Sequence, residues 1–140
     1  MALIRVKGIP MTKEQLEQIY HTARELQMWE HELEHLKSRS PVSSPMPRNG
    51  TGKSISDPTA RAAESVVDLE KKVREFEEKL QRERDEAVQF ILTIPNSLTR
   101  MVVYYRCVSL MSWRRVAYEV GGNNSKDGVR MIYKRFIEDL

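Results

Sequence analysis

Residues 112–140 read SWRRVAYEVGGNNSKDGVRMIYKRFIEDL, and this stretch decides the fold of the C-terminal end of the chain. Ala117 is small enough for two helices to approach closely, and Gly121 follows four residues later, where the chain must reverse. Apolar residues then recur at helical spacing: Val129, Ile132 and Phe136. The pattern predicts a helix capped by Ser112, a turn, and a second amphipathic helix capped by Ser125.

A further helix is expected immediately before this pair. Ile94-Pro-Asn-Ser97 interrupts the preceding helical pattern, and Asn96 or Ser97 can cap the next helix. Its inner face would consist of apolar side chains at helical spacing: Leu98, Val102, Tyr105 and either Cys107 or Val108. Residues 97–140 are a marginal number for independent folding. We therefore expect their apolar faces to pack on the end of the preceding helix or to be completed by dimerisation.

The N-terminal half carries two long helical patterns. Thr12-Lys-Glu-Gln15 is a capping box, and an amphipathic helix follows to about Ser38. Its apolar positions are spaced by three, four or seven: Leu16, Ile19, Ala23, Leu26, Leu33 and Leu36. A second helix is predicted from Asp57-Pro58, an N-cap followed by proline at the first helical position, to about Ile94.

The second helix has the stripe of a coiled coil. Its apolar residues alternate in steps of three and four, and Glu83 alone interrupts them: Val66, Leu69, Val73, Phe76, Leu80, Ala87, Phe90 and Ile94. The stripe can pair with the first helix in a hairpin, or with a second copy of the chain. The sequence leaves both pairings open.

The composition favours an elongated, all-α protein. Of 140 residues, 40% are apolar and 31% are charged, and no Val-, Ile- or Thr-rich run alternates with polar residues. We expect five segments: an N-terminal arm (1–11), the first coiled-coil helix (12–38), a flexible Pro/Gly/Ser linker (39–57), the second coiled-coil helix (58–95) and a helix-turn-helix domain (96–140). The single Cys107 excludes an intramolecular disulfide, and we expect an inert core thiol, a cytoplasmic protein and no membrane contact.

Two short motifs resemble catalytic sites but favour simpler interpretations. His31-Glu-Leu-Glu-His35 has the spacing of a zinc peptidase helix, but His21 lies about 15 Å away along the same helix and cannot supply the third ligand. A solvated helix face explains these residues better. Gly50-Thr-Gly-Lys-Ser54 is similar to part of a phosphate loop, but no strand precedes it. We therefore predict no enzyme, no metal and no cofactor.

Positive charge gathers in the tail. Residues 97–140 contain eight Lys or Arg against four acids, whereas residues 1–96 contain fifteen against sixteen. A basic end on a balanced chain is typical of binding to a polyanion, and the second helix of a helix-turn-helix is where DNA is contacted. The candidates for phosphate contacts are Arg114, Arg115 and Lys134. The candidates for base edges are Ser125, Lys126, Asp127 and Arg130. Asn123 and Asn124 would shape the turn or contact DNA.

The chain resembles a group of small transcription regulators encoded by phages of Gram-positive bacteria, whose C-terminal end is similar to region 4 of the sigma-70 factors. The resemblance covers most of the chain. It rests on TKEQL (12–16), PMPRNG (45–50), the charged coil, SWRRVA (112–117) and GGNNSKDGVRM (121–131). The turn is two residues longer than in a typical region 4. The resemblance implies promoter DNA and host RNA polymerase as partners.

The sequence is therefore interpreted as a non-catalytic, sequence-specific DNA-binding regulator of phage or prophage transcription, with double-stranded DNA as its partner and a homodimer possible through the coil. One alternative is a DNA-packaging recognition subunit similar to a small terminase, which normally forms a ring. The other is a structural or adaptor coiled coil with no affinity for nucleic acid. The mass in solution separates a ring from a monomer or dimer, and weak, unselective duplex binding would favour the adaptor.

Overall fold

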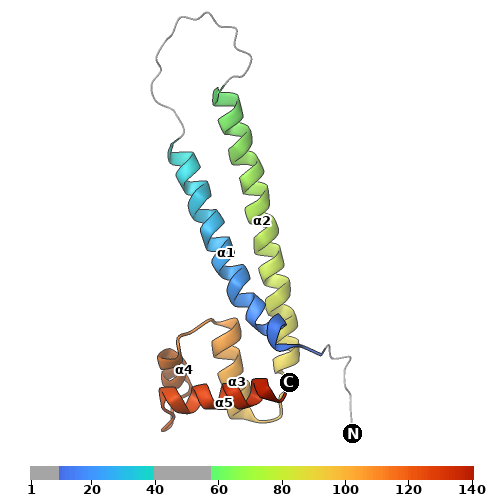
Figure 1. Cartoon of the computed structure of the whole chain (residues 1–140), viewed down its shortest axis with the longest axis vertical. Helices are drawn as coiled ribbons and strands as arrows, with labels where there is room; N and C mark the ends of the chain where they lie inside the picture. Colours follow the sequence, from blue (N-terminus) through green and yellow to red (C-terminus); the bar gives the residue numbers. More distant parts are fainter. Residues whose placement is uncertain (1–9, 40–57) are drawn as a thin grey trace, which may run out of the picture. The chain divides into compact units, whose positions relative to one another are not determined.

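The computed structural model describes residues 10–39 and 58–140 (Figure 1). Within these ranges the chain forms five α-helices and one π-helical turn, so the prediction of an all-α fold is confirmed. Three earlier expectations fall on other residues: nearly all of the N-terminal arm, the linker after Arg39, and the motif at Gly50–Ser54. They lie outside the described residues.

The two long helices begin as their sequences predict. Helix α1, Lys13–Ser38, opens with the capping box, in which the Thr12 amide donates to Gln15 Oε1 at 2.8 Å and the Gln15 amide donates to Thr12 Oγ1 at 3.1 Å. Helix α2, Pro58–Ile91, ends three residues earlier than expected. Pro95 explains this early end, because a residue before proline avoids the helical conformation and proline itself has no amide proton to donate.

The chain forms two compact units. The hairpin unit is Arg24–Glu78, and the core unit joins residues up to Ala23 with Lys79–Leu140. In the hairpin unit α1 and α2 lie side by side (Figure 1), Leu26 and Val73 are buried, and Lys37 Nζ pairs with Glu70 Oε2 at 3.1 Å. Of the two pairings that the sequence left open, the structure has the one within the chain.

The predicted stripe of α2 is its buried face. All eight apolar positions of the stripe are buried or half-buried. Glu83 lies in the same stripe, and among the described residues its Oε1 has no hydrogen-bond partner although it is shielded from solvent. The carboxylate that interrupts the sequence pattern therefore occupies a core-facing position.

The main core of the core unit combines residues far apart in the sequence. Its most buried side chains come from the first turns of α1, the last turns of α2, helix α3 (Ser97–Val103) and the π-helical turn that follows it (Tyr104–Val108): Leu16, Ile19, Ala87, Ile91, Val103, Cys107 and Val108. Tyr133 and Phe136 of helix α5 (Lys126–Glu138) pack against this cluster, and Phe136 lies 6.1 Å from Phe90 between ring centroids. The expectation that the C-terminal helices pack on the end of the preceding helix is confirmed.

The three C-terminal helices share a second, smaller core. These are α3 (Ser97–Val103), α4 (Trp113–Val120) and α5 (Lys126–Glu138). Val102, Val116 and Val129, one from each helix, are fully buried against one another. The predicted caps are all present: Asn96, Ser112 and Ser125 each accept a hydrogen bond from the amide three residues later. Local capping and this valine cluster together fix the directions of the three helices.

A π-helical turn, Tyr104–Val108, follows α3 directly and was not expected from the sequence. Its extra residue per turn rotates the chain, so that both Cys107 and Val108 reach the main core although Val102 faces the smaller one. Leu110 then adopts a positive φ of 56°, which a leucine rarely does. The π-helical turn and the positive φ of Leu110 together lead the chain from the main core to the start of α4.

Cys107 is buried, as predicted, and its Sγ donates to Tyr133 Oη at 3.6 Å. Burial raises the pKa of the Cys107 thiol from 9.0 to about 11. Burial, with Cys107 beside it, also raises the pKa of Tyr133 above its usual range. Both groups are therefore neutral in the folded protein at neutral pH, and the thiol is a poor nucleophile there.

The free energy of unfolding is expected to fall as the pH rises from 9 to 11. The unfolded Cys107 thiol ionises near pH 9, whereas the folded thiol keeps its proton until about pH 11, so its contribution is complete below this window and is lost across it. Two pKa units correspond to about 2–3 kcal/mol. Urea unfolding on both sides of the window measures the decline. The free energy of unfolding of Cys107→Ala should fall less across this window than that of the wild type. An equal fall would contradict the assignment of the pH dependence to Cys107.

Candidate nucleic-acid interface

The nine predicted site residues lie on α4, on the turn after it, and on α5. Eight of them are exposed, and Asn124 is half-buried. None of them lines either of two grooves found among the described residues, of which the one of about 480 Å³ lies beside Leu16, Trp113 and Tyr133. The predicted residues therefore form an open surface, the kind of site that contacts a macromolecule rather than a small molecule.

Two arginines project from the first turn of α4. Ser112 Oγ accepts the Arg115 amide at 3.2 Å and so fixes where the helix begins. The Arg115 side chain is 60% exposed, and its Nε donates to Glu119 Oε2 at 2.7 Å, which leaves the two terminal nitrogens free to bind an anion. Among the described residues no carboxylate lies within ion-pair distance of Arg114. Arg114 thus offers the larger uncompensated charge.

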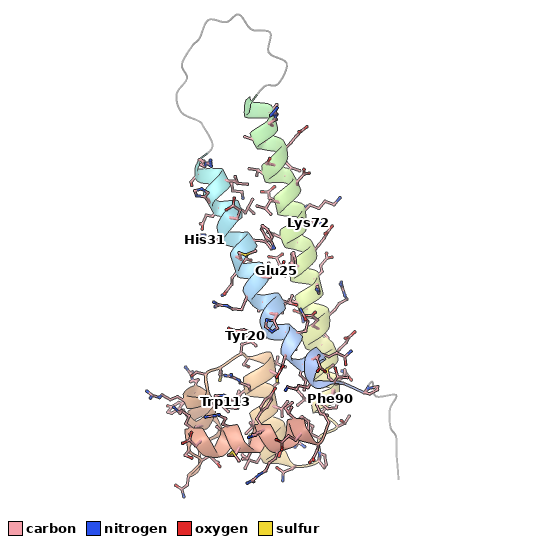
Figure 2. All side chains as sticks on the ribbon, viewed as in Figure 1. Tyr20, Glu25, His31, Lys72, Phe90 and Trp113 are labelled. Atoms are coloured by element: carbon pink, nitrogen blue, oxygen red, sulfur yellow. The ribbon has the colours of Figure 1, made fainter. Side chains whose placement is uncertain are left out.

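Trp113 anchors the start of α4, a role that sequence analysis missed (Figure 2). Its ring lies 5.4 Å from the Tyr133 ring between centroids, and the Arg106 guanidinium sits 4.3 Å from its centroid. Arg106 also donates to the Met111 carbonyl at 2.8 Å. These partners are seven and twenty residues away in the sequence, so local spacing does not predict the contact. The cluster ties α4 to α5 and sets their relative position.

The turn between α4 and α5 depends on its glycines. Gly121 has φ 76° and ψ −157°, a conformation that is nearly restricted to glycine, and Gly122 also has a positive φ of 65°. Asn124 Nδ2 donates to the Gly121 carbonyl at 2.9 Å. Of the two roles expected for the asparagines, Asn124 has the structural one, while Asn123 is exposed.

Helix α5 buries Val129 and leaves its charged residues exposed. Ser125 Oγ accepts the Gly128 amide at 2.9 Å and caps the helix. Lys126, Arg130 and Lys134 follow at intervals of four residues and are all exposed. Arg130 Nη1 lies 3.9 Å from Asp127 Oδ1, and because both side chains are largely exposed, this pair contributes little to stability. The two side chains remain available to an outside partner.

The histidine motif of α1 does not assemble a metal site among the described residues. His31 and His35 are exposed on α1 (Figure 2 labels His31), and the described residues contain no group of three His, Cys, Asp or Glu side chains placed to hold a metal ion. In residues 10–39 and 58–140 no helix is long and apolar enough to span a bilayer. The exposed basic surface is thus the main candidate for function.

Comparison of the chain with protein-family models, with curated proteins and with solved structures found no match.

Proposed function

We propose that the protein is a non-catalytic, sequence-specific DNA-binding regulator that places α5 in the major groove as the second helix of a helix-turn-helix. One observation carries the proposal: Lys126, Arg130 and Lys134 are exposed on three successive turns of a helix that buried Val129 holds in place. A rigid helix with a cationic outer face is what a duplex groove accepts.

The surface divides into phosphate and base contacts. Arg114 and Arg115, on the first turn of α4, and Lys134, on the third turn of α5, would bind backbone phosphates and set the register. Ser125, Lys126, Asp127 and Arg130 stand at the front of α5, where side chains reach base edges. Asp127 can accept from cytosine N4, and Arg130 can donate both hydrogen bonds of a bidentate contact with guanine.

The resemblance to sigma region 4 supports promoter DNA as the target and host RNA polymerase as a second partner. The regulated genes would then be those of a phage or prophage, and the protein would act in the bacterial cytoplasm. The hairpin unit leaves Met28 and Val67 about half exposed or more, at 51% and 59%, and these apolar side chains would be part of any homodimer contact through the coil.

The experiment that tests the function is a selection of bound duplexes from a random pool, made with the full chain at about 50 and 200 mM salt. A DNA-reading regulator enriches one motif, and the same motif survives at the higher salt. The symmetry of the enriched motif also indicates how many copies of the protein bind one duplex. Enrichment of no motif at either salt would refute sequence-specific binding and favour the adaptor function.

Arg130→Ala is expected to weaken binding to the selected duplex by about 1–3 kcal/mol if Arg130 pairs with a guanine. Arg130→Lys is the matched control, since it keeps the charge but loses the planar pair of donors. It should restore the salt dependence without restoring the preference for that guanine. Fluorescence anisotropy with the selected duplex and with single-base variants measures both. Full rescue by lysine would mean that Arg130 contacts only phosphate.

A further inference from the structure

Met131 is an exposed apolar side chain on the charged face of α5. It is 43% exposed, whereas Val129, two residues earlier, is fully buried. Helical spacing places Asp127 four residues before it and Lys134 three residues after it, on the same face, with Arg130 adjacent. No other residue on the exposed side of α5 is a large hydrophobic residue. Met131 is therefore the one large, exposed apolar side chain among the charged residues that α5 would direct toward DNA bases.

Single exposed apolar residues are common and mean little by themselves. Met131 differs from such residues in its position, because its neighbours on α5 are Asp127 and Arg130, proposed to reach base edges, and Lys134, proposed to bind a phosphate. In the major groove the base edges offer hydrogen-bond donors and acceptors and one apolar group, the 5-methyl of thymine. Methionine is unbranched, flexible and polarisable, so it can follow a methyl group whose position varies slightly.

The geometry points to Met131 as a specificity-determining residue that contacts the 5-methyl group of a thymine in the target site. This inference rests on the proposed function and adds to it a base preference that the charged residues cannot supply. Asp127 and Arg130 would recognise cytosine and guanine through hydrogen bonds, and Met131 would add a thymine through apolar contact.

The test uses the selected duplex resynthesised with each thymine replaced in turn by deoxyuridine, which removes only the 5-methyl group. At one or two positions the wild-type chain should bind roughly 3- to 10-fold more weakly, since a buried methyl-sized group contributes about 0.8 kcal/mol. Met131→Ala should bind the thymine duplex more weakly by a similar factor and should no longer distinguish uracil at those positions. Met131→Leu should keep part of the distinction.

Met101→Ala is the matched control, because Met101 of α3 is 37% exposed and lies off this face. It should leave the thymine preference unchanged. If Met131→Ala loses affinity at the same deoxyuridine positions as the wild type does, the inference is wrong. The recovered motif would then still support sequence-specific DNA binding. A motif without thymine also overturns it. If the selection recovers no motif, the proposed function itself fails, and the inference falls with it.

Discussion

Val116→Asp is expected to unfold the three C-terminal helices and to abolish duplex binding. Val116 is fully buried against Val102 and Val129, and the described side chains of that cluster include no Lys, Arg or His to pair with a carboxylate. Burying an unpaired charge costs several kcal/mol, so the cost is expected to exceed about 4 kcal/mol, a large fraction of the stability of a small domain. Far-UV circular dichroism during thermal unfolding measures the effect.

Two companion variants make this result specific. Tyr118→Asp adds the same charge two residues later on α4, at a side chain that is 77% exposed, and should unfold like the wild type. Val116→Thr keeps the shape and replaces one methyl group with a hydroxyl group, so an intermediate loss of about 1–3 kcal/mol is expected. A cooperative transition of Val116→Asp near the wild-type midpoint would show that the valine cluster does not hold these helices together.

Raising the salt from about 50 to about 200 mM is expected to weaken duplex binding by roughly 250- to 1,000-fold. Five exposed cations carry this prediction: Arg114, Arg115, Lys126, Arg130 and Lys134. If these five cations together displace the counterions of five phosphates, whether they lie at the backbone or at base edges in the groove, the slope of log K against log salt should be about −4 to −5, because each displaced charge releases close to one condensed counterion. Titrations with one duplex at four or more salt concentrations measure the slope.

Single variants then show whether this salt dependence comes from the proposed contacts of α4 and α5 with DNA. Lys134→Ala should reduce its magnitude by about 1 and weaken binding to all duplexes alike. Lys71→Ala, which removes the same charge from an exposed position of α2 in the hairpin unit, should leave the slope unchanged. Equal effects of the two substitutions would mean that DNA is attracted by net charge alone and that α5 has no special part.

Features fixed by local bonds were predicted well from the sequence. The capping box at Thr12 and the caps at Asn96, Ser112 and Ser125 involve residues three apart, so the sequence itself contains both partners. The stripe of α2 was predicted for a similar reason, because helical spacing alone decides which side chains share a face. The exposed side of α5 follows from the same periodicity.

Features that depend on distant partners were not predicted. The rotation introduced by the π-helical turn decides that Cys107 and Val108 face the main core together, and nothing local distinguishes this turn from a continued α3. The stacking of Trp113 on Tyr133 likewise joins residues twenty positions apart. For the candidate site, the exposed position of Met131 follows from the spacing of α5, but the pattern of positive charges that indicates the site does not include an apolar residue.

The core unit is discontinuous in sequence, and the hairpin unit is an excursion from it. Leu16 and Ile19 enter the same core as Cys107, so a protease cut anywhere between the two long helices would leave this core divided between two peptides. Equal heptad insertions or deletions in both helices of the excursion would preserve the seam and leave the core untouched. Insertions of this kind can therefore lengthen or shorten the hairpin unit while α5 keeps its packing in the core unit.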